Sequence, residues 1–264
     1  MSSARSSFPR TRPLRACAFP RRNADRSSRL ASLLALAVLV LGPLAMDAGR
    51  AHAGEPREGG QIWATALAQG DLAFLHPKLD RFRTWLELQG RWRSFGESYE
   101  LGMLPRVGLG YAITDRVILT AGFAVVDNDP ARAKPFTELR PWQQLVWNVP
   151  VGGFAFQSRT RLEQRIHQQN VGWRLRELVR MNAPIPGTDR IYLAFYDEPF
   201  FDLDDTPWGQ RRGFRQNRFF AGPGFRLDSE RHFVLEAGYQ NQWIDRRRED
   251  RSNHILLLTL FLNY

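Results

Sequence analysis

The C-terminal segment, residues 253–264, is apolar at every second position and ends on an aromatic residue. The apolar positions are Leu256, Leu258, Leu260 and Leu262, and the last residue is Tyr264. A period of two predicts an extended strand with one apolar face. An alternating strand that ends on an aromatic residue is typical of outer-membrane β-barrels. Leu260, Leu262 and Tyr264 therefore form a predicted signal for insertion by the barrel-assembly machinery.

The same alternation recurs along the chain. In residues 81–93 the odd positions are polar and the even positions are mostly apolar, with Trp85 as the exception. Residues 153–166, 173–181 and 232–243 repeat the pattern. Runs of this period and length favour membrane strands over helices. The predicted fold class is all-β, a transmembrane antiparallel up-and-down β-barrel with apolar residues toward lipid and polar residues toward the lumen.

The predicted connections fall into two length classes. Short turns are expected near residues 113–115, 148–152 and 228–231, and a somewhat longer one at residues 182–189. Longer polar loops are expected at residues 127–135, 202–213 and 245–252. With strands of about 11 residues, all the loops lie at one end of the barrel and all the turns at the other. Outer-membrane barrels show this asymmetry, with the turns on the periplasmic side.

The strand count depends on the segment before residue 81. Counting from Arg81 gives ten strands, an even number as in single-chain bacterial barrels. Residues 62–74 resemble one more strand, which would make eleven and put the N-terminus of the exported chain on the opposite side. Residues 61–80 could instead form a hairpin that brings the total to twelve, or lie inside the barrel or against its rim. We therefore predict a barrel over residues 81–264, with ten strands favoured and twelve open, and an N-terminal segment or extra strands over residues 54–80.

Residues 1–53 have the pattern of a cleaved secretory signal peptide. A basic stretch with eight arginines precedes an apolar run at residues 30–44, and Ala51-His52-Ala53 forms a small-residue cleavage site. The apolar run is short for a membrane-spanning helix. The predicted location of the exported chain is the cell outer membrane. The basic stretch is long for a signal, so a translation start further downstream stays open.

Removal of residues 1–53 changes the charge and the cysteine content. That segment holds nine of the 37 basic and two of the 27 acidic residues, so 28 basic and 25 acidic residues remain, a formal charge of +3. This balance removes the main support for nucleic-acid binding. The only cysteine, Cys17, lies in the signal segment, which leaves no disulfide and no cysteine metal site. No metal site and no cofactor are predicted, and residues 202–205 are interpreted as a solvated acidic loop that could bind a divalent cation loosely.

The alternation assigns a set of charged side chains to the lumen. The set contains nine arginines and five glutamates: Glu87, Arg91, Arg106, Glu138, Arg140, Arg159, Arg161, Glu163, Arg165, Arg174, Arg176, Glu198, Arg218 and Glu236. Planar guanidinium groups suit a packed ion-pair network that fills a narrow barrel, which is the favoured interpretation. The surplus of positive charge also fits a small anion-preferring channel, as arginine rings do in anion-selective pores.

A rim-sited lipid-modifying enzyme is the third hypothesis. The candidate residues Asp250, Ser252 and His254 lie close together on one predicted loop and strand, which is weak evidence for a triad. We therefore predict no catalytic residues. The expected partners are outer-membrane lipid and lipopolysaccharide, whose phosphates Arg246 and the two following arginines could contact. The oligomeric state stays open.

Tryptophans form a separate pattern. Most of them lie near predicted strand ends, where amphipathic rings settle at the headgroup level of a bilayer. They are Trp85, Trp92, Trp142, Trp147, Trp173, Trp208 and Trp243. The sequence thus predicts aromatic belts on the outside of the barrel.

Several short motifs, taken in order, resemble one bacterial family. They are Glu138-Leu139-Arg140-Pro141-Trp142-Gln143-Gln144-Leu145, Arg159-Thr160-Arg161-Leu162-Glu163-Gln164-Arg165, Arg174-Leu175-Arg176, Glu198, Asn217-Arg218 with Gly222, and Gly238-Tyr239, with Trp63 and residues 106–111 also similar. The pattern resembles the family named domain of unknown function 2490 and covers nearly all of the exported chain. The resemblance implies an exported β-barrel, and it implies no particular activity.

Overall fold

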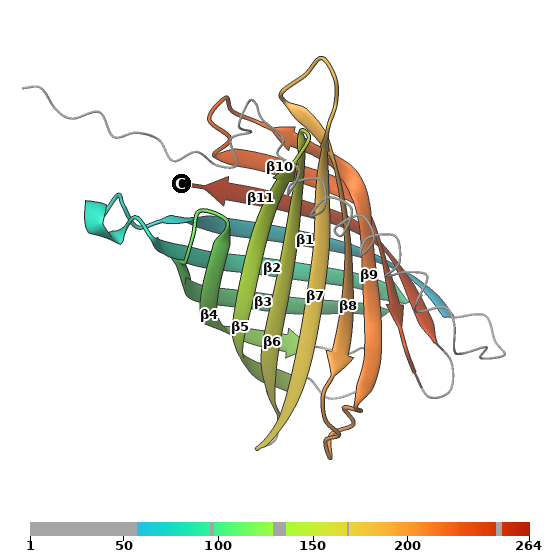
Figure 1. Ribbon diagram of the computed structural model, residues 1–264. Coiled ribbons are helices and arrows are strands. Elements are labelled where there is room, and N and C mark those ends of the chain that lie inside the picture. Colours follow the sequence, from blue (N-terminus) through green and yellow to red (C-terminus); the bar gives the residue numbers. More distant parts are fainter. Residues whose placement is uncertain (1–56, 96–97, 129–135, 168, 247–249) are drawn as a thin grey trace, which may run out of the picture.

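The wall of the protein consists of eleven β-strands. We describe them from a computed structural model that defines residues 57–95, 98–128, 136–167, 169–246 and 250–264 (Figure 1). The elements in chain order are β1 (Arg57–Asp71), η1 (Pro77–Leu79), β2 (Phe82–Phe95), β3 (Ser98–Ala112), β4 (Val117–Asn128), β5 (Phe136–Val151), β6 (Phe154–His167), β7 (Asn170–Pro184), β8 (Ile191–Asp202), β9 (Gly213–Arg226), β10 (Phe233–Ile244) and β11 (Arg251–Asn263). The predicted signal peptide, residues 1–53, lies outside the described residues.

The strands close into one barrel in the order β1-β11-β10-β9-β8-β7-β6-β5-β4-β3-β2. Each strand pairs antiparallel with its sequence neighbour, as the alternation predicts. The closing pair is different, because β1 runs parallel to β11, with Gln61 opposite Ile255 and Leu67 opposite Phe261. An odd number of strands in an up-and-down barrel requires one parallel pair, since the first and last strands then point the same way. The predicted count of ten, with twelve as the alternative, is therefore wrong.

Residues 61–80 account for the error. Residues 57–71 form the wall strand β1, and the next residues connect it to β2 at the end of the barrel that carries Tyr264. His76 Nδ1 accepts a hydrogen bond from the Lys78 backbone N–H at 3.1 Å at the start of η1. Phe74 packs edge-on against Tyr264, with ring centroids 5.8 Å apart. The segment is thus one wall strand followed by an exposed connection to β2, and neither a hairpin nor a plug.

The connections segregate by end, in agreement with the sequence. Residues 113–116, 152–153, 185–190 and 227–232 join strands at the end that carries Tyr264, which we call the turn end. Residues 203–212 and 245–250 join strands at the opposite end, which we call the loop end. The predicted loop at 127–135 falls mainly outside the described residues. Two connections depart from the pattern, because β3 begins three positions after the end of β2, and β7 begins three positions after the end of β6, so short connections also occur at the loop end.

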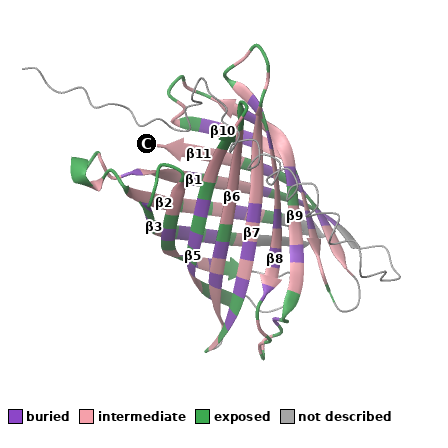
Figure 2. Ribbon diagram, viewed as in Figure 1, coloured by how far each residue is buried: buried purple, intermediate pink, exposed green. Residues whose placement is uncertain are grey.

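Each strand shows two unlike faces. Outward positions carry large apolar side chains, such as Leu119 at 50% and Leu256 at 51% exposure, while inward positions are buried or half-buried (Figure 2). Glycine occurs where the interior is crowded. A Cβ atom on Gly224 would lie 2.2 Å from the ring of Tyr192, so no larger residue fits there without displacement. In the described part of the chain, no helix is long and apolar enough to cross a membrane.

The tryptophans divide between the two faces. Trp92, Trp147 and Trp173 are outward and 41–51% exposed, as the belt interpretation requires. Trp142 is fully buried inside the barrel, and Trp85 packs against it with ring centroids 6.2 Å apart. The assignment of these two rings to an outer belt is wrong. Period-two parity places both on the interior face together with the charged residues, and that parity is the correct signal.

Candidate functional site

The barrel interior is the candidate functional site, because the predicted lumen residues meet there. Twelve of the fourteen line a cavity of about 1410 Å³. The other two, Arg161 and Glu163, are covered by neighbouring side chains, with 0% and 1% exposure. Alternate positions of the strands therefore bring these charges together in an enclosed space.

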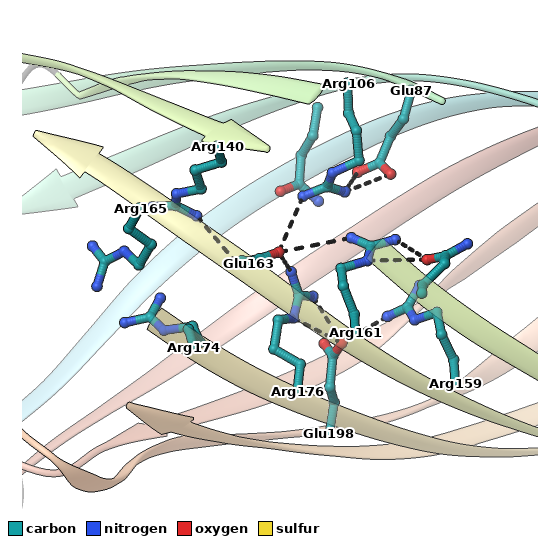
Figure 3. A network of polar contacts seen from close by, with 12 residues as sticks. Glu87, Arg106, Arg140, Arg159, Arg161, Glu163, Arg165, Arg174, Arg176 and Glu198 are labelled. Atoms are coloured by element: carbon teal, nitrogen blue, oxygen red, sulfur yellow. Dashed lines mark hydrogen bonds and ion pairs between the residues drawn. The ribbon is translucent and has the colours of Figure 1, made fainter. Parts of the chain in front are cut away.

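Glu163 on β6 is at the centre of the network. Its Oε1 atom lies 2.6 Å from Nη1 of Arg176 and 3.9 Å from both Arg106 Nη2 and Arg161 Nη1. Its Oε2 atom lies 3.8 Å from Arg140 Nη1. These arginines come from β3, β5, β6 and β7 (Figure 3). One carboxylate thus lies within 4 Å of four cations, which offset the cost of burying its charge.

Glu198 on β8 forms a second centre. Its Oε1 atom accepts hydrogen bonds from Nη2 of Arg159 at 2.6 Å and from Nη2 of Arg176 at 2.7 Å. Its Oε2 atom lies 4.0 Å from Arg218. Arg176 therefore bridges Glu163 and Glu198, and its planar guanidinium donates to both carboxylates.

Further ion pairs lie on either side of these centres. Nη1 of Arg106 donates to both carboxylate oxygens of Glu87 at 2.7 Å. Arg140 and Arg165 each donate from Nε to Glu138 at 2.6 Å. Of the predicted set, Glu236 at the turn end accepts from the Tyr192 hydroxyl at 2.5 Å and from Arg180.

Two members of these pairs are missing from the predicted lumen set. Arg180 on β7 lies on the polar face of the run 173–181 with Arg174 and Arg176, but it was not included in the set. Asp202, assigned to a loop, is the last residue of β8 and accepts from Nε of Arg174 at 2.7 Å. Counting parity to the end of β8 would have found Asp202.

Aromatic rings carry contacts between distant strands. The guanidinium carbon of Arg161 lies 4.7 Å from the ring centroid of Trp142 on β5 and 5.4 Å from that of Trp85 on β2. Nε and Nη2 of the same arginine donate to Gln144 at 3.0 and 2.6 Å. Trp63 on β1 contacts two arginines, Arg91 at 4.3 Å and Arg218 of β9 at 5.0 Å. Because β2 and β6, and β1 and β9, are not neighbours in the wall, these contacts cross the interior.

Three neutral amides form a cluster near the loop end of β9, β10 and β11. Asn253 donates to Gln242 at 3.0 Å, and Gln242 donates to Gln216 at 3.0 Å. All three side chains are buried. The interior thus contains a local amide cluster beside the arginine–glutamate network, which alternation alone did not distinguish.

Residues 203–212 fold over the loop end of the interior. Trp208 lies 4.7 Å from the guanidinium carbon of Arg165, and Gln210, at 4% exposure, accepts from Nη1 of the same arginine at 3.0 Å. Asp204 accepts from the Trp173 backbone at 2.8 Å and from Gln210 at 2.6 Å, and Asp205 accepts from the backbone of Arg212. The acidic loop considered for cation binding therefore uses its carboxylates in protein contacts. In the described part of the chain, no group of three or more metal-ligating side chains occurs.

The residues considered for a rim enzyme have separate partners. Ser252 accepts from Nδ2 of Asn241 at 2.9 Å, and His254 Nδ1 pairs with the hydroxyl of Tyr239 at 2.7 Å. Asp250 accepts from the backbone N–H of Arg246 at 3.0 Å. These contacts do not order the three groups as nucleophile, base and orienting acid. The two arginines after Arg246 lie outside the described residues.

A comparison with protein families identifies the chain. A family model described as protein of unknown function, DUF2490, matches residues 60–253. The chain belongs to the DUF2490 family. A similar protein, the Uncharacterized protein MexAM1_META1p0181 of Methylorubrum extorquens, is 31% identical over 235 residues, which cover 86% of this chain and 97% of the relative. No solved structure matches. The family match begins in β1 and ends in β11, so it covers the DUF2490 barrel almost completely.

Proposed function

We propose that this DUF2490 chain is an outer-membrane β-barrel whose interior is closed by its own ion pairs, and that it acts as a structural element of the outer membrane. The outer-membrane part of the proposal is supported by the signal-like segment at residues 1–53, the terminal Tyr264 and the apolar outward side chains. Lipid and lipopolysaccharide are then its surroundings.

The contact of Glu163 with four arginines carries the closed-interior part. Those arginines extend from four strands toward one buried carboxylate, and Arg161 continues to Trp85 on the far side. A barrel of this strand number has a small bore that long side chains can fill. Moving an ion through the centre would require these contacts to break, and a carboxylate left without partners inside is strongly disfavoured.

Membrane integration and conductance test the two parts separately. Purified barrel should float with lipid vesicles and migrate differently on gels before and after boiling. Peripheral behaviour and unchanged migration would contradict the membrane assignment.

Conductance in planar bilayers tests the closed interior. We expect the folded wild-type protein to conduct no current and the Glu163→Gln variant to form open channels, because the arginines lose their shared anion. Glu230→Gln, in an exposed turn, is the matched control and should stay silent.

A small anion-preferring channel is the second candidate. The cavity of about 1410 Å³ favours it, since its lining includes Asp115 and Arg231 at the turn end and Trp208 and Arg246 at the loop end. Arginine outnumbers glutamate among the predicted lumen residues, which would select anions. Stable wild-type openings with an anion-selective reversal potential, altered by Arg161→Gln or Arg176→Gln, would establish this function in place of the closed barrel.

A further inference from the structure

A polar patch interrupts the apolar outer face in the middle of β6–β9. We define the outer patch as Ser158, Thr160, Glu177, Asp197 and Asn217. Each of these residues alternates with buried or half-buried inward neighbours, such as Arg161, Arg176 and Glu198, so their side chains point away from the interior. Their positions are central, since Glu177 is at the midpoint of β7.

The first half of the outer patch surrounds Glu177. Its Oε1 atom accepts from the Ser158 hydroxyl at 2.7 Å, and its Oε2 atom accepts from the Thr160 hydroxyl. Ser158 pairs with Trp147 and Thr160 pairs with Leu145 in the neighbouring strand, and both partners are outward and more than 40% exposed. Both carboxylate oxygens are therefore oriented on the outer face by hydroxyl donors.

The second half surrounds Asp197 on β8. Its Oδ1 atom accepts from Nδ2 of Asn217 at 2.6 Å, and its opposite neighbour Phe219 is 45% exposed. Asp197 pairs with Val179, which makes Glu177 its diagonal neighbour across β7–β8. Diagonal neighbours on one face are roughly 7–8 Å apart. The outer patch therefore presents acidic residues on two adjacent strands, with the Glu177 carboxylate held toward β6 and that of Asp197 held toward β9.

The outer patch has no basic partner among the side chains that the structure describes. Among described side chains, no outward position of β5–β9 carries Lys or Arg, and the bulged Arg215 of β9 donates inward to the backbone of Asp245. By contrast, the neighbouring outward pair Gln143 and Gln164 is neutral and exchanges hydrogen bonds at 2.9 and 3.3 Å. The acidic pair is thus the unbalanced part of this face.

The next step rests on the proposed outer-membrane location. If the wall spans a bilayer, both carboxyl groups lie at hydrocarbon depth, where ionisable groups are expensive and mark functional contacts. Cationic lipid headgroups are about 15 Å away from the midplane of a core about 30 Å thick. A side chain of a protein partner can reach that depth, and a cation there would balance the carboxylates.

We propose that the outer patch docks a second membrane protein that presents a Lys or Arg side chain at mid-bilayer depth. A second copy of this chain does not fit, because no outward strand position with a described side chain carries Lys or Arg in any part of the wall. The hydroxyl and amide donors hold the carboxylates in place, and the surrounding Leu145, Trp147 and Phe219 supply apolar contact area that includes aromatic rings, which are enriched in interfaces.

A lipid-embedded probe tests the charge requirement. The probe is an apolar helix of about 20 residues with one central lysine and a terminal dansyl group, and its matched form has glutamine instead. Energy transfer from the barrel tryptophans to dansyl in phosphatidylcholine vesicles reports association. We expect the lysine probe to bind about tenfold more tightly than the glutamine probe. Glu177→Gln combined with Asp197→Asn should remove that preference.

Controls separate the possible failures. Gln143→Leu with Gln164→Leu alters the adjacent neutral pair and should leave the preference unchanged. Equal binding of both probes to the wild type would overturn the docking proposal. Disulfide-linked dimers of a Val179→Cys variant would also overturn it, because they would show that this face packs against a second copy of the chain. If the purified barrel does not float with the vesicles, the membrane location itself fails, and the docking proposal fails with it.

Discussion

The guanidinium of Arg161 on β6 contacts the indole of Trp85 on β2, 5.4 Å from its ring centroid, across the interior of the barrel. Four strand-to-strand steps along the shorter way around the wall separate the two residues. The same guanidinium packs on Trp142 and donates to Gln144. A contact of this kind ties opposite parts of the wall together, which hydrogen bonds between adjacent strands cannot do.

Glu163→Gln should strongly destabilise the folded barrel. The substitution removes the anion that four buried arginines share, and breaking a buried ion pair typically costs about 3–5 kcal/mol. Urea unfolding of the protein in vesicles, followed by tryptophan fluorescence, measures the change in the free energy of unfolding. Glu230→Gln on the exposed turn should change it by less than about 0.5 kcal/mol. Equal effects of the two substitutions would show that the network does not stabilise the barrel.

Two strand glycines should respond very differently to alanine. A Cβ atom on Gly224 would lie 2.2 Å from the Tyr192 ring, whereas one on Gly60 would meet nothing within 4 Å. Overpacking of this kind costs about 1–3 kcal/mol, so Gly224→Ala should lower the free energy of unfolding and Gly60→Ala should leave it nearly unchanged. The same urea titration compares them. A neutral Gly224→Ala would mean that Tyr192 moves freely and that its bond to Glu236 is dispensable.

The alternation of residue types predicted the barrel and the face on which each charged side chain lies, because a strand has only two faces. It did not predict which inward side chains meet, since the curvature of the wall brings together residues of distant strands, such as Arg161 and Trp85. The count of strands failed at β1, where the expectation of an even number outweighed the strand pattern of residues 62–74. Asp202 was missed because acidic residues after an apolar run resemble a loop.

An arginine on the outer wall tests whether a bilayer surrounds it. Leu86 is on β2, points outward and is about half exposed. If lipid covers Leu86 near the midplane, Leu86→Arg should cost about 2–4 kcal/mol. Leu227→Arg, in the turn after β9, should cost about 0–1 kcal/mol. Folding titrations in vesicles measure both. Similar small costs at both positions would contradict a membrane-spanning wall.

The turn between β9 and β10 should lose stability in acid because of Asp228. Its carboxylate accepts from the backbone N–H groups of Phe233 at 2.8 Å and His232 at 3.0 Å. These hydrogen bonds, that of Phe233 foremost, lower the pKa of Asp228 below its ordinary value of 3.8. A carboxyl whose pKa is lower in the folded state stabilises it above pH 3.8, and that contribution disappears as the pH falls through the lowered pKa. Asp228→Asn should therefore be less stable than the wild type at pH 6, and the difference should shrink below pH 3.8. Urea midpoints of both proteins across this range measure the difference. A constant difference at every pH would assign the effect to the side chain's shape and not to its charge.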